Sequence, residues 1–398
     1  MATLMRWRRS VGLVGVVALL AFAAFEVRAY APVVTFVVRA AQVGGWPGRV
    51  ARWYARPFTE TIIEIPSRDG PLRARLYRPQ PPRERAALLV PGIHPAGIDE
   101  PRLVGLSREL AATGIPVLTP ELPDMTHFRI TAQATDMIED AGRWLAAQPD
   151  LAPDGRIGMM GISFSGGLSV VAAGRAGLRA HVAYVFAYGG HGDLPRVLRY
   201  LCTGIEPEVP ADQQALDPHA GRYWQPHDYG VAVILHEIAP SLVPADQVMP
   251  LRQGIETFLD ASGLAGVDDA RAAQLFARAR AMASQLPEPA ATLLEEVNDR
   301  NVKQLGPELL ARIGSYGTAP GLSPDRSPPP TAPVFLLHGR DDNVVPSAES
   351  ILLADWLRKR THVHLLVSTL LGHAEVDRQA RFHDVWQLIE FWKDMIAQ

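Results

Sequence analysis

Short, largely apolar segments alternate with helix-like segments along much of this 398-residue chain. The apolar segments include 86–90, 156–161, 181–188 and 334–338. Strands that are buried on both faces read as continuous apolar runs, and their alternation with helices is typical of a mostly parallel sheet with helices on both faces. The sequence therefore predicts an α/β fold, doubly wound. A hairpin over 61–77, with an Asp-Gly turn, would form one antiparallel edge of the sheet.

The alternation stops between residues 189 and 331. Helix-like stretches occur within this segment at 269–286 and 289–305, and a proline-rich linker closes it. An unstructured loop of that length is not tenable inside a compact domain. We therefore predict an inserted helical cap at 189–331, between two parts of one core at 59–188 and 332–398.

Residues 1–58 form a separate N-terminal segment, in which arginines at 6, 8 and 9 precede the apolar run 11–25. A helix needs about 20 apolar residues to cross a bilayer, so this run is short for a span and close to the length of a signal-peptide core. We expect an uncleaved membrane anchor with the remainder exported, because the leading arginines favour the cytoplasmic side. The alternatives are secretion after signal-peptide removal, with a small-residue cleavage site at 21–23, and a buried or peripheral helix.

A second apolar stretch, 30–43, could lie in the membrane interface. Residues 1–58 carry eight arginines and one glutamate, a balance that suits anionic lipid. The whole chain has a net charge of −3 and no basic block with interleaved aromatics, so a nucleic-acid partner is not expected. The lone Cys202 excludes an internal disulfide, and there is no spaced cysteine set for zinc.

Residues 156–167, RIGMMGISFSGG, predict a strand, a sharp turn and a helix. A nucleophilic serine at such a turn needs small neighbours two residues before and after it, and Gly161 and Ser165 meet this requirement around Ser163. The alternative is a glycine-rich turn without catalytic function. Ser165 is a rival nucleophile, disfavoured because the strand ends two residues too early for it.

Two later segments supply an acid and a base. Asp341 and Asp342 follow the apolar strand 334–338, and carboxyl ends of strands are where open α/β sheets hold their sites. His373 follows the last predicted strand. An aspartate pair after a strand can also be a loop cap, and a lone histidine is more often structural. Ser163, Asp342 and His373 nevertheless stand in the Ser, acid, His order of α/β-hydrolases.

The sequence resembles the α/β-hydrolase superfamily, closest to its dienelactone-hydrolase-like and prolyl-oligopeptidase-like branch. The resemblance rests on SRDG at 67–70, RIGMMGISFSGG, HGRDDNVVP at 338–346 and the late Gly372-His373, and it covers about 59–188 and 332–398. It implies that Asp342, rather than Asp341, is the acid. Two positions depart from the pattern: Ser165 replaces the usual glycine, and Pro91-Gly92 replaces a His-Gly pair.

An acyl-transfer site also needs two backbone N–H groups aimed at the developing oxyanion. We predict Phe164 and Ile93 as these donors. His94, beside them, could touch substrate or pack the loop.

The sequence thus predicts a serine hydrolase that cleaves a carboxylic ester through an acyl-enzyme, without metal or organic cofactor, and lipophilic esters are among the candidate substrates. Its partners would be a small ester-like substrate and the membrane; its oligomeric state is left open. The cap aromatics could line an acyl pocket or form ordinary cap core; they are Tyr200, Tyr223, Trp224 and Tyr229. The cap histidines are expected to be surface or packing residues; they are His191, His219, His227 and His236. The alternatives are a peptidase or amidase, and a non-catalytic membrane-anchored binding protein.

Overall fold

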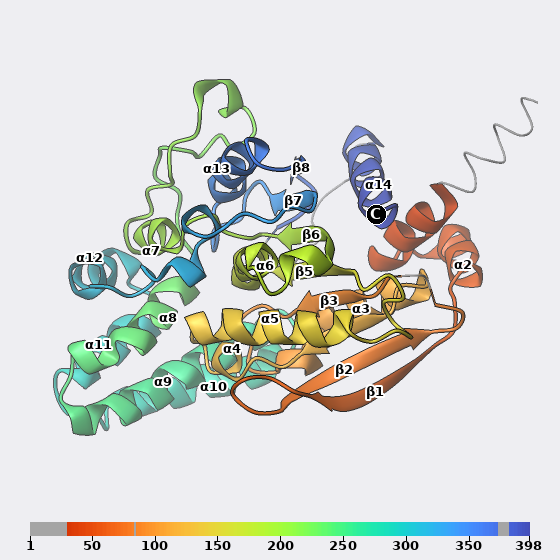
Figure 1. Cartoon of the computed structure of the whole chain (residues 1–398). Coiled ribbons are helices and arrows are strands. Elements are labelled where there is room, and N and C mark those ends of the chain that lie inside the picture. Colours follow the sequence, from red (N-terminus) through yellow and green to blue (C-terminus); the bar gives the residue numbers. More distant parts are fainter. Residues whose placement is uncertain (1–29, 83–84, 373–381) are drawn as a thin grey trace, which may run out of the picture.

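The computed structural model describes residues 30–82, 85–372 and 382–398, and within them it shows an eight-stranded sheet with the order β1-β2-β4-β3-β5-β6-β7-β8 (Figure 1). The antiparallel hairpin β1–β2 forms one edge, β2 also pairs antiparallel with β4, and the remaining pairs are parallel. The predicted α/β sheet and its hairpin edge are confirmed. The strands are β1 (Phe58–Ile65), β2 (Leu72–Pro79), β3 (Ala87–Val90), β4 (Val117–Pro120), β5 (Ile157–Ile162), β6 (Val182–Tyr188), β7 (Val334–Gly339) and β8 (Val363–Ser368).

Two apolar cores lie on the two faces of this sheet. Successive strand residues alternate between them: Leu88 packs in one and Leu89 in the other, and Val185 and Phe186 divide in the same way. This period of two explains why the central strands are apolar at every position. Helices α5 (Ala132–Ala146) and α6 (Phe164–Gly174) cover the first face, whereas α3 (Pro101–Ala112) and α14 (Phe382–Ile396) cover the second.

Local sequence sets where several of these helices begin. The Glu100 carboxylate accepts a hydrogen bond from the Leu103 N–H at 2.7 Å, and Pro101 fills the first helical position of α3. The Thr131 hydroxyl caps α5 in the same manner, by accepting from the Ala134 N–H. Each cap satisfies a donor that a helix leaves without an internal partner.

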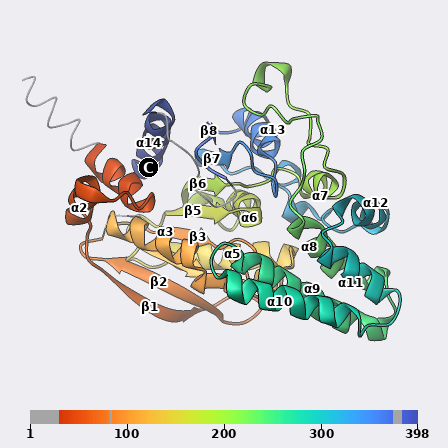
Figure 2. The same ribbon diagram turned by 180° about the vertical axis from the view of Figure 1, so that it is seen from behind.

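The chain between β6 and β7 is largely helical and extends from one end of the sheet, as Figures 1 and 2 show. An ion pair ties this segment to helix α13 (Ser347–Arg358), because the half-buried Arg196 contacts the fully buried Glu349 at 2.6 Å. The apolar core of the segment between β6 and β7 is continuous with one of the apolar cores of the sheet. The domain boundaries drawn from sequence therefore stay a prediction. The helices are α7 (Leu194–Thr203), α8 (Tyr229–Ile238), α9 (Ala245–Leu264), α10 (Asp269–Ala283), α11 (Ala290–Asn298) and α12 (Val302–Arg312).

Residues 30–40 form a helix that packs against α14. Phe36 is buried with its ring centroid 4.7 Å from that of Trp392, and the Tyr30 hydroxyl donates to Glu390. The inner face of this helix is therefore covered by α14, which is distant in sequence and supplies an aromatic surface, and the expectation that 30–43 lies in a membrane interface stays a prediction. The apolar run 11–25 lies outside the described residues. Within the described part of the chain, no helix has the length and apolar character that a membrane span requires.

Candidate active site

Ser163 lies at a sharp turn between β5 and α6. Its backbone angles are φ 58° and ψ −134°, a conformation that a residue with a side chain adopts only when its surroundings impose it. The predicted strand, turn and helix around this residue are present. The turn also requires Gly161, since a Cβ there would lie 2.3 Å from the Ser165 carbonyl oxygen and 2.6 Å from the Ser169 Oγ.

The backbone of Ser163 is fixed by hydrogen bonds from both its N–H and its carbonyl group. The Ser163 N–H donates to the Tyr188 carbonyl at 2.7 Å, and the Ser163 carbonyl accepts from the Gly166 N–H at 2.8 Å. The side chain is half-buried and does not cap α6. This is the arrangement that a nucleophilic hydroxyl needs at the positive end of a helix.

Ser165, the rival nucleophile, has a structural role instead. It is fully buried, and its Oγ lies 3.0 Å from the Val90 carbonyl oxygen, 2.8 Å from the Ile162 carbonyl oxygen and 3.0 Å from the Ile162 N–H, from which it accepts. This hydroxyl joins the ends of β3 and β5. A serine can therefore replace glycine here, because the site meets its hydrogen-bonding capacity.

Asp342 follows β7 with its carboxylate turned inward. The side chain is 2% exposed, and Oδ1 accepts from the Val344 and Val345 N–H groups at 2.9 and 3.0 Å. Asp341, by contrast, points outward, with its carboxylate 3.5 Å from the His219 Nε2. Only Asp342 of the pair is thus held by the backbone in a buried position, as an orienting acid requires.

Two consecutive residues, Tyr188 and Gly189, contact Ser163 and Asp342 respectively. Tyr188 accepts from the Ser163 N–H, and its neighbour Gly189 lies against Asp342, where an added Cβ would be 3.4 Å from Oδ2. His373 lies outside the described residues. The residue before it, Gly372, accepts a hydrogen bond from the Tyr188 hydroxyl at 2.9 Å. The chain that leads to His373 is therefore located beside the same residue that contacts Ser163.

The two predicted oxyanion donors flank Ser163. Phe164 is the first residue of α6, and a helix offers no internal acceptor to its first N–H groups. Ile93 follows Gly92, where an added Cβ would lie 3.5 Å from the Ser163 Cβ and 3.4 Å from the Ile162 carbonyl oxygen. The loop after β3 therefore passes directly beside the turn.

The cap and this loop contact each other through one side chain from each. The Tyr229 hydroxyl of α8 lies 3.5 Å from the Ile93 carbonyl oxygen. His94 accepts from the Ala96 N–H at Nδ1, and its Nε2 lies 3.3 Å from the position of a Cβ on Gly263 of α9. Burial lowers the pKa of His94, so the ring is neutral near pH 7 and packs between loop and cap.

The other cap residues singled out in the sequence have packing roles or lie on the surface. Tyr200 is fully buried, Trp224 stacks on His219 with 3.7 Å between ring centroids, and Tyr223 is 48% exposed. His191 is fully buried, within 2.7 Å of the Leu322 carbonyl oxygen. His236 contacts Glu256, and His227 lies beside Asp228.

Sequence reasoning missed an acidic cluster next to Asp342. Asp217 is fully buried and accepts from the Ser347 hydroxyl at 2.7 Å. Glu206 is 3% exposed, and burial together with the negative charge of Asp217 raises its pKa to about 9. Both residues lie in loops of the cap segment, where no sequence pattern pairs them with a residue after β7.

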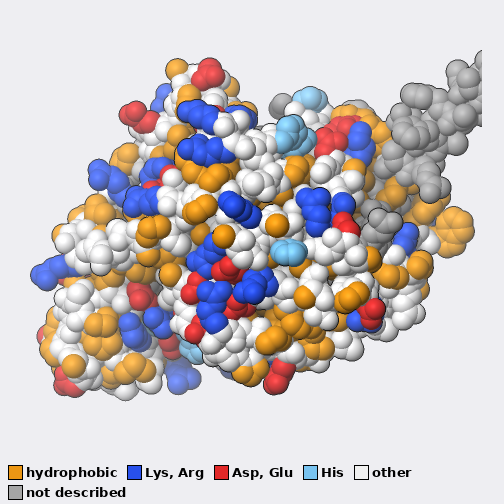
Figure 3. All heavy atoms as spheres, viewed as in Figure 1, with side chains coloured by type: hydrophobic (Ala, Val, Ile, Leu, Met, Phe, Trp, Pro, Cys, Tyr) orange, Lys and Arg blue, Asp and Glu red, His pale blue; other side chains and the backbone are white. Residues whose placement is uncertain are grey.

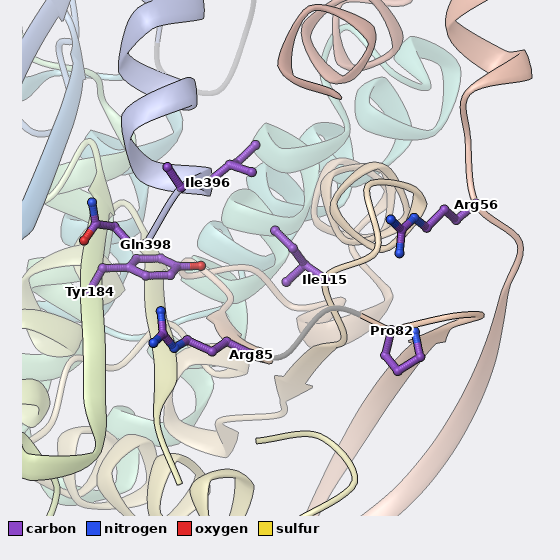
Figure 4. A pocket seen from close by; sticks show the side chains of 8 residues that line it. Arg56, Pro82, Arg85, Ile115, Tyr184, Ile396 and Gln398 are labelled. Carbon is purple, nitrogen blue, oxygen red and sulfur yellow. The ribbon is translucent and has the colours of Figure 1, made fainter. Parts of the chain in front are cut away.

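A separate hollow of about 440 Å³ lies elsewhere in the molecule (Figure 4). Its lining includes Arg85 and Ile115, which precede β3 and β4. Ser163 lies at the opposite, carboxyl end of the sheet. This hollow is therefore not part of the candidate site. Among the described residues, no group of three or more His, Cys, Asp or Glu side chains is placed to hold a metal ion.

No family model and no curated protein matches the sequence. Solved structures that it resembles include a hyperthermophilic esterase from Pyrobaculum calidifontis, 15% identical with a TM-score of 0.43, over 86% of this chain and 85% of that one. An acylaminoacyl peptidase from Pyrococcus horikoshii is 12% identical with a TM-score of 0.43, over 88% of this chain and 42% of that one. Thermogutta terrifontis esterase 2, phosphoramylated by tabun, is 11% identical with a TM-score of 0.43, over 85% of this chain and 94% of that one.

A serine on a strained strand-to-helix turn, at the carboxyl end of a strand in a mostly parallel sheet, has the geometry of a nucleophile elbow.

Proposed function

We propose that this protein is a serine hydrolase that cleaves a carboxylic ester, with Ser163 as nucleophile, His373 as base and Asp342 as orienting acid. The observation that carries the proposal is the strained turn at Ser163, which places this serine directly before the first residue of α6 without a cap bond from its side chain to the helix. Strain of this kind persists only where the surrounding structure imposes it, and it is concentrated at functional sites. Tyr188 supports the assignment, because it contacts both Ser163 and the residue before His373.

The reaction would follow the acyl-enzyme route. His373 takes the Ser163 proton as the Oγ attacks the ester carbonyl, and the Phe164 and Ile93 N–H groups stabilise the tetrahedral oxyanion. The imidazolium then protonates the leaving alcohol. Water, deprotonated by the same imidazole, attacks the acyl-enzyme and releases the acid. Asp342 stays ionised throughout and stabilises the imidazolium.

Covalent labelling tests this proposal. A fluorophosphonate probe should label the wild type, and Ser163→Ala should abolish both labelling and hydrolysis of short p-nitrophenyl esters without a change in melting temperature. Ser165→Ala is the matched control and should still be labelled. Labelling that persists in Ser163→Ala contradicts the assignment. An unlabelled wild type favours the binding-protein alternative, and turnover of amides over esters favours the peptidase.

We also propose that the segment 11–25 anchors the chain to a membrane and that the hydrolase is exported. The proposal rests on the apolar run and its leading arginines. Cell fractionation combined with N-terminal sequencing of the mature chain tests it. A full-length chain recovered free in the cytoplasm contradicts it.

A further inference from the structure

Helix α2 (Gly45–Trp53) presents an apolar, aromatic face to solvent. The described residues leave twelve large apolar side chains exposed, and five of these belong to this helix or its flanks: Val43, Trp46, Val50, Trp53 and Tyr54. Trp46 is 70% exposed and Trp53 82%. Exposed apolar residues are normal when scattered, whereas a cluster marks an interaction surface.

The exposed residues lie on one side of α2 and the buried residues on the other. At about 100° per residue, Trp46, Val50 and Trp53 fall within about 60° of one another, and the buried Gly48 and Ala51 lie opposite. Figure 3 shows hydrophobic side chains on the surface at the edge of the molecule where α2 lies in Figure 1. We call Val43, Trp46, Val50, Trp53 and Tyr54 the α2 patch.

The rest of the protein holds α2 in this orientation. The Arg39 guanidinium, itself 8% exposed, donates to the Ala51 carbonyl at 3.1 Å and pairs with Glu109 of α3 at 2.6 Å. At the start of the helix, a Cβ on Gly48 would lie 2.1 Å from the Val43 carbonyl oxygen. The α2 patch is thus displayed by a fixed scaffold.

The charged residues of the segment that carries the patch have one sign. Arg49 and Arg52 are exposed, and no aspartate or glutamate occurs between Glu26 and Glu60. Tryptophan and tyrosine with arginine, rather than aliphatic side chains alone, are the residues enriched where a protein meets lipid headgroups. The apolar run 11–25, preceded by Arg6, Arg8 and Arg9, stands directly upstream in the chain.

We propose that the α2 patch binds the headgroup region of an anionic phospholipid bilayer, with the aromatic side chains inserted and Arg49 and Arg52 on lipid phosphates. A second copy of this chain fits less well, because a two-fold interface would set the same arginines against each other. Residues 1–29 also fit less well, because they bring four further arginines and one glutamate.

The placement has a consequence for access to the site. β1 begins at Phe58, shortly after α2, and the pairing pattern makes β1 run in the same direction as β5. The α2 patch therefore lies at the amino ends of these strands and Ser163 at their carboxyl ends (Figure 1). A bilayer on α2 leaves the candidate active site facing the aqueous phase.

A dye attached to the patch tests the proposal on the full chain. The natural cysteine, Cys202, is buried, so Val50→Cys offers one accessible thiol for an environment-sensitive fluorophore. Val267→Cys, between α9 and α10, is the matched control because Val267 is 76% exposed and does not belong to the α2 patch. With vesicles of phosphatidylcholine and phosphatidylglycerol, the dye on Val50→Cys should shift to shorter wavelength and be quenched by brominated acyl chains, whereas that on Val267→Cys should not change.

Charge and aromatic variants sharpen the result. Arg49→Gln and Arg52→Gln should each weaken the vesicle titration of the labelled protein about fivefold. Trp46→Ser combined with Trp53→Ser should abolish the shift of the dye while esterase activity is kept. The retained activity separates this test from that of the proposed reaction. The proposal is overturned if the chain sediments with vesicles while the Val50→Cys dye is unchanged, if both dyes shift alike, or if the shift occurs without lipid. If the shift without lipid depends on protein concentration, the patch binds a second copy of the chain. If that shift is independent of protein concentration, the patch binds residues 1–29 of the same chain.

Discussion

Gly161→Ala should inactivate the protein far more than it destabilises it. The added methyl would lie 2.3 Å from the Ser165 carbonyl oxygen, whereas ordinary contact begins at 3.4 Å, so the first turn of α6 must move by about 1 Å. Overpacking of this kind costs about 1–3 kcal/mol of unfolding free energy. The same movement displaces Ser163 and the Phe164 N–H, and a 1 Å misplacement of reacting groups costs about 100-fold in rate.

Ester hydrolysis and urea unfolding, measured on the same preparation, test this prediction. Gly105→Ala is the matched control, because Gly105 lies in α3 with open space around its Cβ position. It should be stabilised by about 0.5–1 kcal/mol through the better helix propensity of alanine, with unchanged activity. If Gly161→Ala keeps wild-type activity and stability, the turn does not position the reaction and the reasoning fails.

Three further predictions concern buried polar groups. Burial and Asp217 raise the pKa of Glu206 to about 9, so between about pH 4.5 and 9 the folded state holds a proton that the unfolded chain releases. The free energy of unfolding of the wild type should therefore fall as pH rises through this range. Glu206→Gln should remove up to about 6 kcal/mol of this dependence, measured by thermal unfolding across pH, and equal slopes for both proteins would refute it. Ser165→Ala should cost about 1–2 kcal/mol of unfolding free energy because it frees the acceptor at Val90 and the donor and acceptor at Ile162; an unchanged urea midpoint would contradict this. Glu349→Gln should cost about 2 kcal/mol because it removes the charge from the hydrogen bonds that Glu349 accepts from Arg196 and from the Gly192 and Asp193 N–H groups, while Asp325 still pairs with Arg196 at 3.2 Å. A melting temperature equal to wild type would show that the Glu349 charge contributes nothing.

Much of the sheet follows from local pattern. Strands β3, β5, β6 and β7 were identifiable because burial on both faces makes every position apolar, and the hairpin because its turn chemistry is specific. The turn at Ser163 was predictable for the same local reason, since Gly161 is small where strand and helix approach each other. The roles of Asp342 and His373 in catalysis stay predictions.

What the sequence could not supply depends on contacts between distant segments. The structural role of Ser165 needs the Val90 carbonyl of another strand, and the helix at 30–40 is covered by α14, more than 300 residues later. The raised pKa of Glu206 requires Asp217 to be buried beside it.

Chain order and residue size by themselves determined the α/β fold class and the candidate nucleophile, because steric and apolar patterns act within a few residues. Tertiary structure decided that the Ser165 hydroxyl is held by hydrogen bonds, which carboxylate is buried and which apolar face of the N-terminal region reaches solvent. The physical reason is that burial and hydrogen-bond partners are properties of three-dimensional neighbours, and these neighbours come together only when the sheet assembles.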